Sequence, residues 1–132
     1  MFKSKRYDDE TLKHLQEVQI MIFKDFIKIC EENDLDYYVY GGTLLGTIRH
    51  GGFIPWDDDI DVIMFRKEFD KLNKIMETNL DEKYDFYNCL NEKTYFYTFA
   101  RLTLKDTLFE EWWANQVEYI PNIFIDIFIL DN

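Results

Sequence analysis

A group of carboxylates is the feature of this sequence that most clearly indicates chemistry. Asp57, Asp58, Asp59 and Asp61 stand within five residues, directly before an apolar segment that predicts a strand. Carboxylates this close repel one another, so one of them resists ionisation unless a cation or a basic group compensates the charge. Magnesium binds hard oxygen ligands and usually combines one or two carboxylates with substrate phosphates and water. We therefore predict a Mg²⁺ or Mn²⁺ site with Asp59 and Asp61 as ligands; the alternative is that these acids solvate a loop or cap a helix.

A fifth acid, Asp126, lies in the middle of the apolar segment Ile123 to Leu130. Burying an unpaired carboxylate is costly or forces it to protonate, so we expect Asp126 to have a partner. If this segment is a strand beside the one that follows the aspartate group, Asp126 joins Asp59 and Asp61 at one cation site. Such a site could hold one metal ion or two. Two metal ions would hold the attacking and the leaving oxygens of the reaction. A hydrogen-bond network around a buried aspartate is the competing interpretation.

The residues Gly41, Gly42 and Thr43 follow an aromatic segment and open a short helix that we expect over Thr43 to Arg49. Backbone N–H groups at a helix N-terminus bind phosphate oxygens, and the Thr43 hydroxyl would add a donor. Alone, this pattern is an ordinary tight turn. It gains meaning because the Asp-x-Asp pair begins 16 residues after Thr43.

Four further residues are candidates for substrate binding. Arg49 and Arg101 carry guanidinium groups that hold phosphates through paired hydrogen bonds. His50 lies beside Arg49, but no feature of the sequence gives it a proton-transfer partner, which favours a polar turn residue. Trp56 either stacks on a base or sugar or fills the core beside the aspartates.

The elements that must position these residues follow from periodicity. Apolar residues recur at three- and four-residue steps from about Asp9 to Asn33, which predicts an amphipathic helix capped by Asp8 or Asp9. A second amphipathic helix is expected over Arg66 to Asn79. Strands are predicted at Tyr37 to Tyr40, Ile60 to Phe65, Phe86 to Leu90, Tyr95 to Leu104, Thr107 to Trp112 and Ile123 to Leu130. The predicted fold class is α+β, a mixed sheet backed by two main helices.

Composition sets the remaining bounds. The chain has 132 residues, of which 47% are hydrophobic, so residues 1–132 are expected to form a single globular domain. A net charge of -11 argues against broad nucleic-acid binding, which depends on Lys and Arg. Cys30 and Cys89 lack the spacing of a disulfide framework or a zinc site. No signal peptide or transmembrane segment is predicted, so we expect a cytoplasmic protein whose membrane contact, if any, is peripheral at the inner face.

Two segments resemble the signature of the LicD/fukutin-type phosphotransferases: GGTLLG at residues 41–46 and IRHGGFIPWDDDIDV at residues 48–62. The segment FIDIFILD at residues 124–131 is similar to the second acidic block of that family. The resemblance implies a nucleotidyltransferase-like fold in which the glycine turn, the Asp-x-Asp pair and a third strand-borne acid form the metal site. These roles fall on Gly42, Thr43, Asp59, Asp61 and Asp126.

The resemblance also implies an activity. Members of the family use CDP-activated donors and move phosphocholine or a polyol phosphate such as ribitol phosphate onto glycans, teichoic acids, lipopolysaccharide or capsule. An acceptor hydroxyl would attack phosphorus and CMP would leave. Asp57 or Asp58 would take the hydroxyl proton, and sequence alone does not separate the base from the metal ligands.

Family members are commonly longer, and the resemblance ends with the chain, so we expect this domain to lack the C-terminal part of a longer relative. Three alternatives remain open. A true nucleotidyltransferase would use the same metal site to attach a nucleoside monophosphate. A catalytically silent domain would bind nucleotide or metal without turnover, and a scaffolding module would bind a cation without nucleotide.

Overall fold

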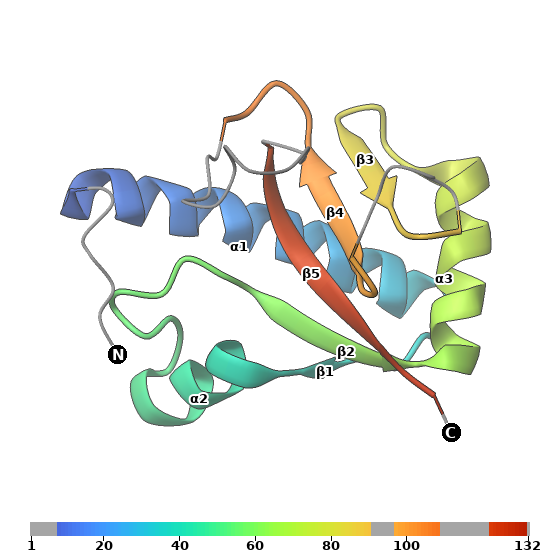
Figure 1. Cartoon of the computed structure of the whole chain (residues 1–132), viewed down its shortest axis with the longest axis horizontal. Coiled ribbons are helices and arrows are strands. Elements are labelled where there is room, and N and C mark those ends of the chain that lie inside the picture. The colour runs from blue at the N-terminus through green and yellow to red at the C-terminus, as the bar shows by residue number, and fades with distance from the viewer. Residues whose placement is uncertain (1–7, 91–96, 109–121, 132) are drawn as a thin grey trace.

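The computed structural model describes residues 8–90, 97–108 and 122–131, and it has an α+β architecture, as expected (Figure 1). Five strands form one mixed sheet in the order β1-β2-β5-β4-β3. The elements are α1 (Asp9–Glu32), β1 (Tyr38–Val39), α2 (Gly41–His50), β2 (Asp61–Phe65), α3 (Arg66–Asn79), β3 (Tyr84–Tyr87), β4 (Ala100–Leu104) and β5 (Ile123–Leu130).

Helix α1 forms where the apolar spacing predicts it. The Asp8 side chain caps its first turn, with Asp8 Oδ1 accepting a hydrogen bond from the Thr11 N–H at 2.7 Å. The helix buries a stripe that includes Ile22, Phe26 and Cys30, all 0% exposed. The same stripe contains Gln19, a polar residue that the sequence analysis does not single out.

The centre of the sheet joins the two acidic segments. Strands β2 and β5 are parallel neighbours, and their register places Asp61 opposite Asp126. The structure thus meets the condition under which Asp126 lies beside the strand that follows the aspartate group. On its other edge β5 pairs antiparallel with β4, which places Arg101 opposite the same Asp126. Three charged residues therefore form a row across three adjacent strands.

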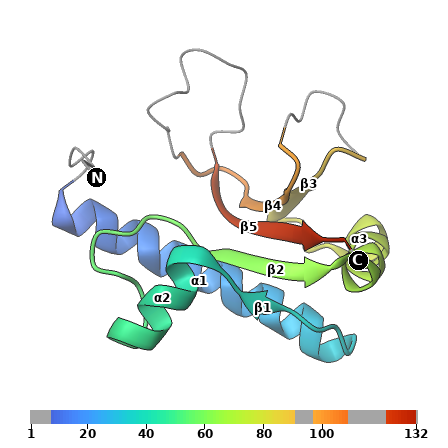
Figure 2. The same ribbon diagram turned by 60° about the horizontal axis from the view of Figure 1, so that its bottom comes forward.

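The two faces of the sheet differ in character. On one face Val62, Ala100 and Ile127 are aligned in neighbouring strands and 0% exposed. Helix α1 packs against β4 and β5 on this side, and α3 packs against β2 and β5 (Figures 1 and 2). Because strand side chains alternate, the row of Asp61, Asp126 and Arg101 belongs to the opposite face. Helices α1 and α3 are therefore the two main helices that were expected to back the mixed sheet.

Helix α2 is longer than expected, since it begins at Gly41 and ends at His50. Gly51 closes it with a φ of 67°, a left-handed conformation that suits glycine, so His50 is the last helical residue and the turn begins at Gly51. Gly46 lies in its interior because the chain returns very close to it. A Cβ atom at Gly46 would lie 2.4 Å from the Gly52 carbonyl oxygen and 2.8 Å from the Ile54 nitrogen.

Several strand boundaries differ from the predictions. Strand β1 is limited to Tyr38–Val39, because Tyr40 already caps α2. Strand β3 spans Tyr84–Tyr87 instead of Phe86 to Leu90, since Asn88 Oδ1 accepts a hydrogen bond from the Leu90 N–H and turns the chain.

The later strand predictions are corrected in the same way. Strand β4 begins at Ala100, later than the predicted Tyr95, and residues 91–96 lie outside the described part. Thr107 and Leu108 are not in a strand, and the rest of the segment predicted to Trp112 is not described. Among the described residues, no helix combines the length and the apolar character that a membrane span requires.

Candidate metal and phosphate site

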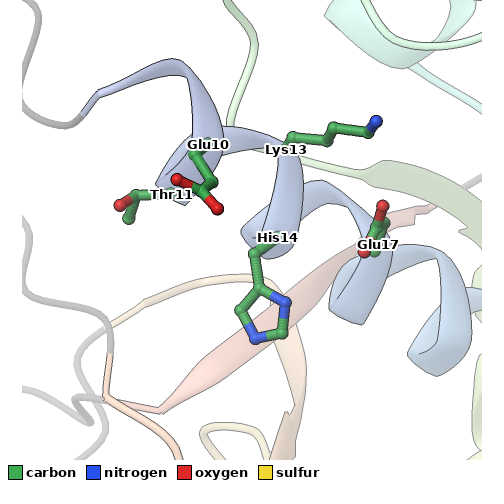
Figure 3. A pocket seen from close by; sticks show the side chains of 5 residues that line it. All are labelled: Glu10, Thr11, Lys13, His14 and Glu17. Atoms are coloured by element: carbon green, nitrogen blue, oxygen red, sulfur yellow. The ribbon is translucent and has the colours of Figure 1, made fainter.

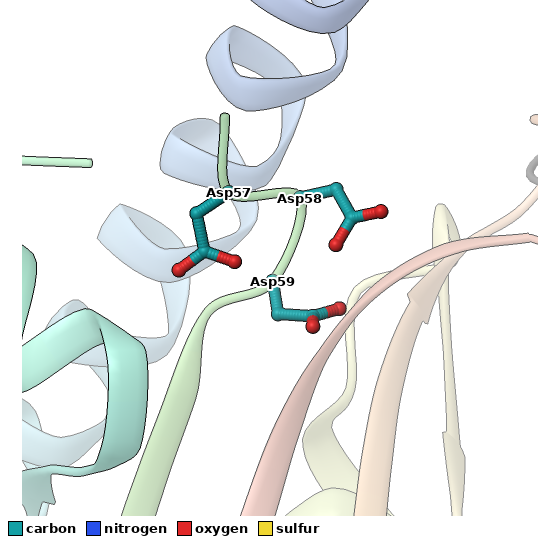
Figure 4. A group of neighbouring side chains, drawn as sticks. All are labelled: Asp57, Asp58 and Asp59. Atoms are coloured by element: carbon teal, nitrogen blue, oxygen red, sulfur yellow. The ribbon is translucent and has the colours of Figure 1, made fainter. Parts of the chain in front are cut away.

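The aspartate loop lies between the end of α2 and the start of β2. The Asp57 N–H donates to the Ile54 carbonyl at 2.9 Å, which makes a turn just before the acids. Asp57, Asp58 and Asp59 project from one bend of this loop (Figure 4). Each offers one carboxylate oxygen, and these oxygens lie within 4.8 Å of one another. They are the group of potential metal ligands that the described residues bring together most closely.

Helix α1 holds the backbone of this loop. Gln16 Nε2 donates to the Asp57 carbonyl at 2.7 Å, and Gln19 Nε2 donates to the Asp58 carbonyl at 2.6 Å. The same amide of Gln19 makes a longer contact, 3.4 Å, with the carbonyl of Phe124 on β5. Neither glutamine is among the site residues that the sequence predicts. The available signal was a glutamine in the apolar stripe of an otherwise regular amphipathic helix.

The N-terminus of α2 abuts the aspartates. Thr43 Oγ1 accepts a hydrogen bond from the Asp61 N–H at 2.8 Å, so this hydroxyl keeps its own hydrogen for donation. A Cβ atom at Gly42 would lie 2.7 Å from Asp57 Oδ2, and one at Gly41 would lie 3.5 Å from Asp61 Oδ2. Gly41 also has a φ of 59°. The glycine turn and the acids therefore lie side by side, as the spacing predicts.

Asp126 is buried and has the partner that its position requires. Arg101 Nε donates to Asp126 Oδ1 at 2.8 Å and Arg101 Nη2 donates to Asp126 Oδ2 at 3.3 Å. The side chains of this pair are only 3% and 9% exposed. Arg101 is thus the counterion of the third acid, and its predicted contact with substrate phosphates stays a prediction.

Burial and mutual repulsion shift the protonation of the acids. Burial, followed by the charges of Asp58, Asp61, Asp57 and Asp126, raises the pKa of Asp59 to about 8. Burial, followed by the Asp126 and Asp57 charges, raises the pKa of Asp61 to about 7, although Arg101 opposes this. Burial also raises the pKa of Asp126 against the lowering effect of Arg101. Arg101 alone therefore leaves part of the negative charge uncompensated.

These properties fit a divalent cation. The donor set consists of carboxylate oxygens, which Mg²⁺ and Mn²⁺ prefer. A cation would also relieve the repulsion that raises the pKa values of Asp59 and Asp61. The carboxylate oxygens of Asp57, Asp58 and Asp59 lie within 4.8 Å of one another, and the charges of Asp61 and Asp126 also act on Asp59. The ligand set Asp59, Asp61 and Asp126 stays a prediction.

Three predicted substrate-binding residues lie away from the aspartates or face solvent. Arg49 and His50 are exposed in the last turn of α2, at the opposite end of that helix from Gly42. Trp56 is 62% exposed, so the interpretation that it fills the core is wrong. Its exposure next to Asp57 leaves stacking on a substrate as the open prediction.

Two pockets lie outside the aspartate group. One, of about 460 Å³, is bordered by aromatic residues and by the ion pair of Arg66 and Asp131. The other is an open hollow on the first turns of α1, where Lys13 and His14 point in different directions (Figure 3). Neither contains a predicted site residue.

Comparison with known proteins identifies relatives of this chain. Residues 34–129 match the model of the LicD/FKTN/FKRP nucleotidyltransferase domain. Over 78 residues the chain is 44% identical to the lipopolysaccharide cholinephosphotransferase LicD of Haemophilus influenzae, an alignment covering 59% of this chain and 28% of that protein. It is 43% identical over 58 residues to an uncharacterized Rickettsia typhi protein, covering 44% of this chain and 18% of that protein.

A human protein is also similar. The ribitol 5-phosphate transferase FKRP of Homo sapiens is 38% identical over 42 residues, which are 32% of this chain and 8% of that protein. The chain therefore spans well under half the length of these curated relatives. Because the family model covers more than half of the 132 residues and includes both acidic segments, the chain belongs to the LicD/FKTN/FKRP nucleotidyltransferase-domain family.

Proposed function

We propose that this chain carries the catalytic centre of a divalent-metal-dependent phosphotransferase that uses a CDP-activated donor. The observation that carries the proposal is the convergence of the Asp57–Asp59 cluster, the Asp61 and Asp126 pair on adjacent strands, and the glycine-rich start of α2. Carboxylates that hold a cation beside a helix N-terminus suit a substrate with linked phosphates. The transferase names of two relatives support the same reaction class.

In the proposed reaction the N-terminus of α2 binds donor phosphate oxygens through the Gly42 and Thr43 amides, and the Thr43 hydroxyl donates a further hydrogen bond. A divalent cation on Asp59, Asp61 and Asp126 would supply positive charge to the donor pyrophosphate. These interactions hold the donor in line with the incoming acceptor.

The transfer exchanges one phosphorus–oxygen bond for another. An acceptor hydroxyl oxygen attacks the phosphorus that bears the transferred group, and the bond from that phosphorus to the bridging oxygen breaks. CMP leaves with the bonding electron pair. Asp57 or Asp58 accepts the hydroxyl proton, since both lie at the loop beside the phosphate-binding turn.

The relatives' names suggest the substrates. We propose phosphocholine or a polyol phosphate as the transferred group and lipopolysaccharide as one acceptor class, following these names. A cell-surface glycan or teichoic-acid-type polymer is proposed as the other acceptor class on the resemblance to the family alone. We also propose that the protein acts in the cytoplasm, at the inner face of a membrane.

Product identity tests the proposal. The purified chain is incubated with CDP-choline and Mg²⁺, and products are identified by phosphorus NMR. The expected products with water as acceptor are CMP and phosphocholine, and the chelator EDTA should stop their formation. A family description as a nucleotidyltransferase domain favours one second candidate, in which CTP and phosphocholine give CDP-choline and pyrophosphate. A parallel incubation with CTP and phosphocholine tests this second candidate. If CDP-choline forms there and none is cleaved in the first assay, the second proposal replaces the first.

A further inference from the structure

Gln19 is a polar residue in the stripe by which α1 packs on the sheet. It is 0% exposed, as are Ile22 and Phe26 further along the same stripe. A buried amide is unfavourable unless its polar atoms are hydrogen-bonded, and leucine or methionine at this position would pack without that penalty. The hydrogen bonds of Gln19 therefore need an explanation beyond helix packing.

The amide of Gln19 joins the two chain segments that bring in the acids. Its Nε2 donates to the carbonyl of Asp58, next to Asp59, and contacts the carbonyl of Phe124, two residues before Asp126. Both partners are carbonyl oxygens, which only accept hydrogen bonds, so the nitrogen end of the amide must face them. Gln19 thus connects the aspartate loop to β5.

The oxygen of the same amide makes no comparable hydrogen bond. Within the described residues, Gln19 Oε1 is buried and has no hydrogen-bond partner. A buried acceptor without a partner opposes folding. A glutamine at this position is therefore explained by the hydrogen bonds of its Nε2, which hold the aspartate loop in place. Gln16, one helical turn earlier, acts on the same loop through the Asp57 carbonyl at 2.7 Å.

We propose that Gln19, assisted by Gln16, is a positioning residue that holds the aspartate loop against β5 so that the acids can share one divalent cation. The inference rests on the proposed metal site. Carboxylates that repel one another move apart when their backbone is free to do so. The two glutamines oppose that movement by fixing two consecutive carbonyl groups, those of Asp57 and Asp58. They lie before residue 34, where the family match begins.

Mn²⁺ affinity is the first test. Gln19→Met keeps an unbranched side chain of similar length but removes the donor. We expect it to weaken Mn²⁺ binding about 10- to 100-fold, the effect typical of residues that orient metal ligands. Ile22→Val is the matched control, because it trims the same buried stripe without touching the loop. It should lower the melting temperature while Mn²⁺ affinity stays within about twofold of wild type.

Equal Mn²⁺ affinity in wild type and Gln19→Met would overturn the inference, as would an equal loss of affinity in Ile22→Val. Gln16→Met provides a second variant, since Gln16 is only half-buried and its replacement leaves the core intact. We expect a smaller but measurable loss of affinity in Gln16→Met. Wild-type affinity in that variant would contradict the assisting role of Gln16.

Backbone hydrogen exchange in metal-free protein separates this inference from the proposed function. The Asp61 N–H donates to Thr43 Oγ1 and the Asp126 N–H donates to the Ile60 carbonyl. In Gln19→Met both amides should exchange at least about tenfold faster relative to Ile22→Val. Faster exchange in a protein that does not bind Mn²⁺ would sustain the positioning role and refute the metal site. Unchanged exchange would refute the positioning role.

Discussion

The Arg101 guanidinium lies between an aromatic ring and a carboxylate. Its central carbon is 3.5 Å from the centre of the Phe124 ring, while Nε and Nη2 bind Asp126. Both charged side chains are buried, so each depends on the other for compensation. Arg101 therefore controls the charge of the third acid in the site.

Removing this arginine should destabilise the fold. Arg101→Met leaves Asp126 buried without its counterion, and the expected loss in the free energy of unfolding is about 3–5 kcal/mol. Urea denaturation measures it. The double variant Arg101→Met/Asp126→Leu should recover most of the loss because no charge is left buried. A single variant as stable as wild type would show that Asp126 has other compensation.

Asp61→Asn should remove metal binding without unfolding the protein. The substitution preserves the shape of the side chain and the backbone hydrogen bond to Thr43, but it removes a charge from the cluster. We expect Mn²⁺ affinity to fall by at least about tenfold, or about 1.4 kcal/mol. Asp70→Asn, at an exposed position of α3, is the control and should bind as wild type. Wild-type metal-dependent activity in Asp61→Asn would eliminate the proposed site.

The raised pKa values predict a pH dependence of stability. The ordinary pKa of aspartate is 3.8, while those of Asp59 and Asp61 in the fold are about 8 and about 7. Between these values the folded chain retains protons that the unfolded chain has lost. Raising the pH through this window therefore destabilises the metal-free fold.

Thermal melts in EDTA from about pH 4 to about pH 8 measure this effect. We expect a falling melting temperature, a flatter profile for Asp59→Asn, and a stabilisation by Mn²⁺ that grows with pH. A melting temperature of metal-free wild type that falls no more steeply than that of Asp59→Asn would show that burial and mutual repulsion do not raise the pKa of Asp59.

At the scale of elements, the tight packing around α2 fixes the relation between the glycine turn and the acids. The chain at Gly52 and Ile54 lies against Gly46 by backbone atoms, whereas the side chain of Asp57 lies against Gly42. Backbone atoms move only with the loop, and a carboxylate can rotate. The two glycines should therefore differ in their response to an added methyl group.

Gly46→Ala should lower the free energy of unfolding by about 1–3 kcal/mol, because overpacking forces the 52–54 segment to shift. Gly42→Ala should unfold nearly as wild type but displace the Asp57 carboxylate, whose negative charge lies beside the proposed ligand Asp59, and so weaken Mn²⁺ binding. Urea denaturation and Mn²⁺ titration of both variants check this pair. Normal metal binding in Gly42→Ala would mean that Asp57 is not part of the site.

The elements were predictable to the extent that local patterns determined them. The spacing of apolar residues in α1 and α3 and the alternation around β2 gave their positions closely. The ends of β3 and β4 were misplaced because an Asn88 turn and tertiary pairing, rather than strand propensity, set them. The role of Gln19 depends on a contact with a distant segment, and that of Gly46 on the way the chain folds back over α2; periodicity shows neither.

At the scale of the whole molecule, one sheet assembles the site from segments that are far apart in sequence. The strand order brings β5 next to β2, so Asp126 meets Asp61 across 65 residues of chain. A lone acid in an apolar strand predicted that Asp126 has a partner, but no pattern in the sequence indicated Arg101 as that partner. That choice follows from the antiparallel register of β4 on β5.

The most direct test of the proposed metal-dependent nucleotide site is calorimetric titration of CDP-choline and CDP-ribitol into the chain. The titration is done with Mg²⁺, then with EDTA, and repeated with the double variant Asp59→Asn/Asp61→Asn. We predict binding that requires Mg²⁺ and is lost in the double variant. Binding that persists unchanged in EDTA or in the folded double variant, or no binding by folded wild-type protein with Mg²⁺, would contradict the proposal.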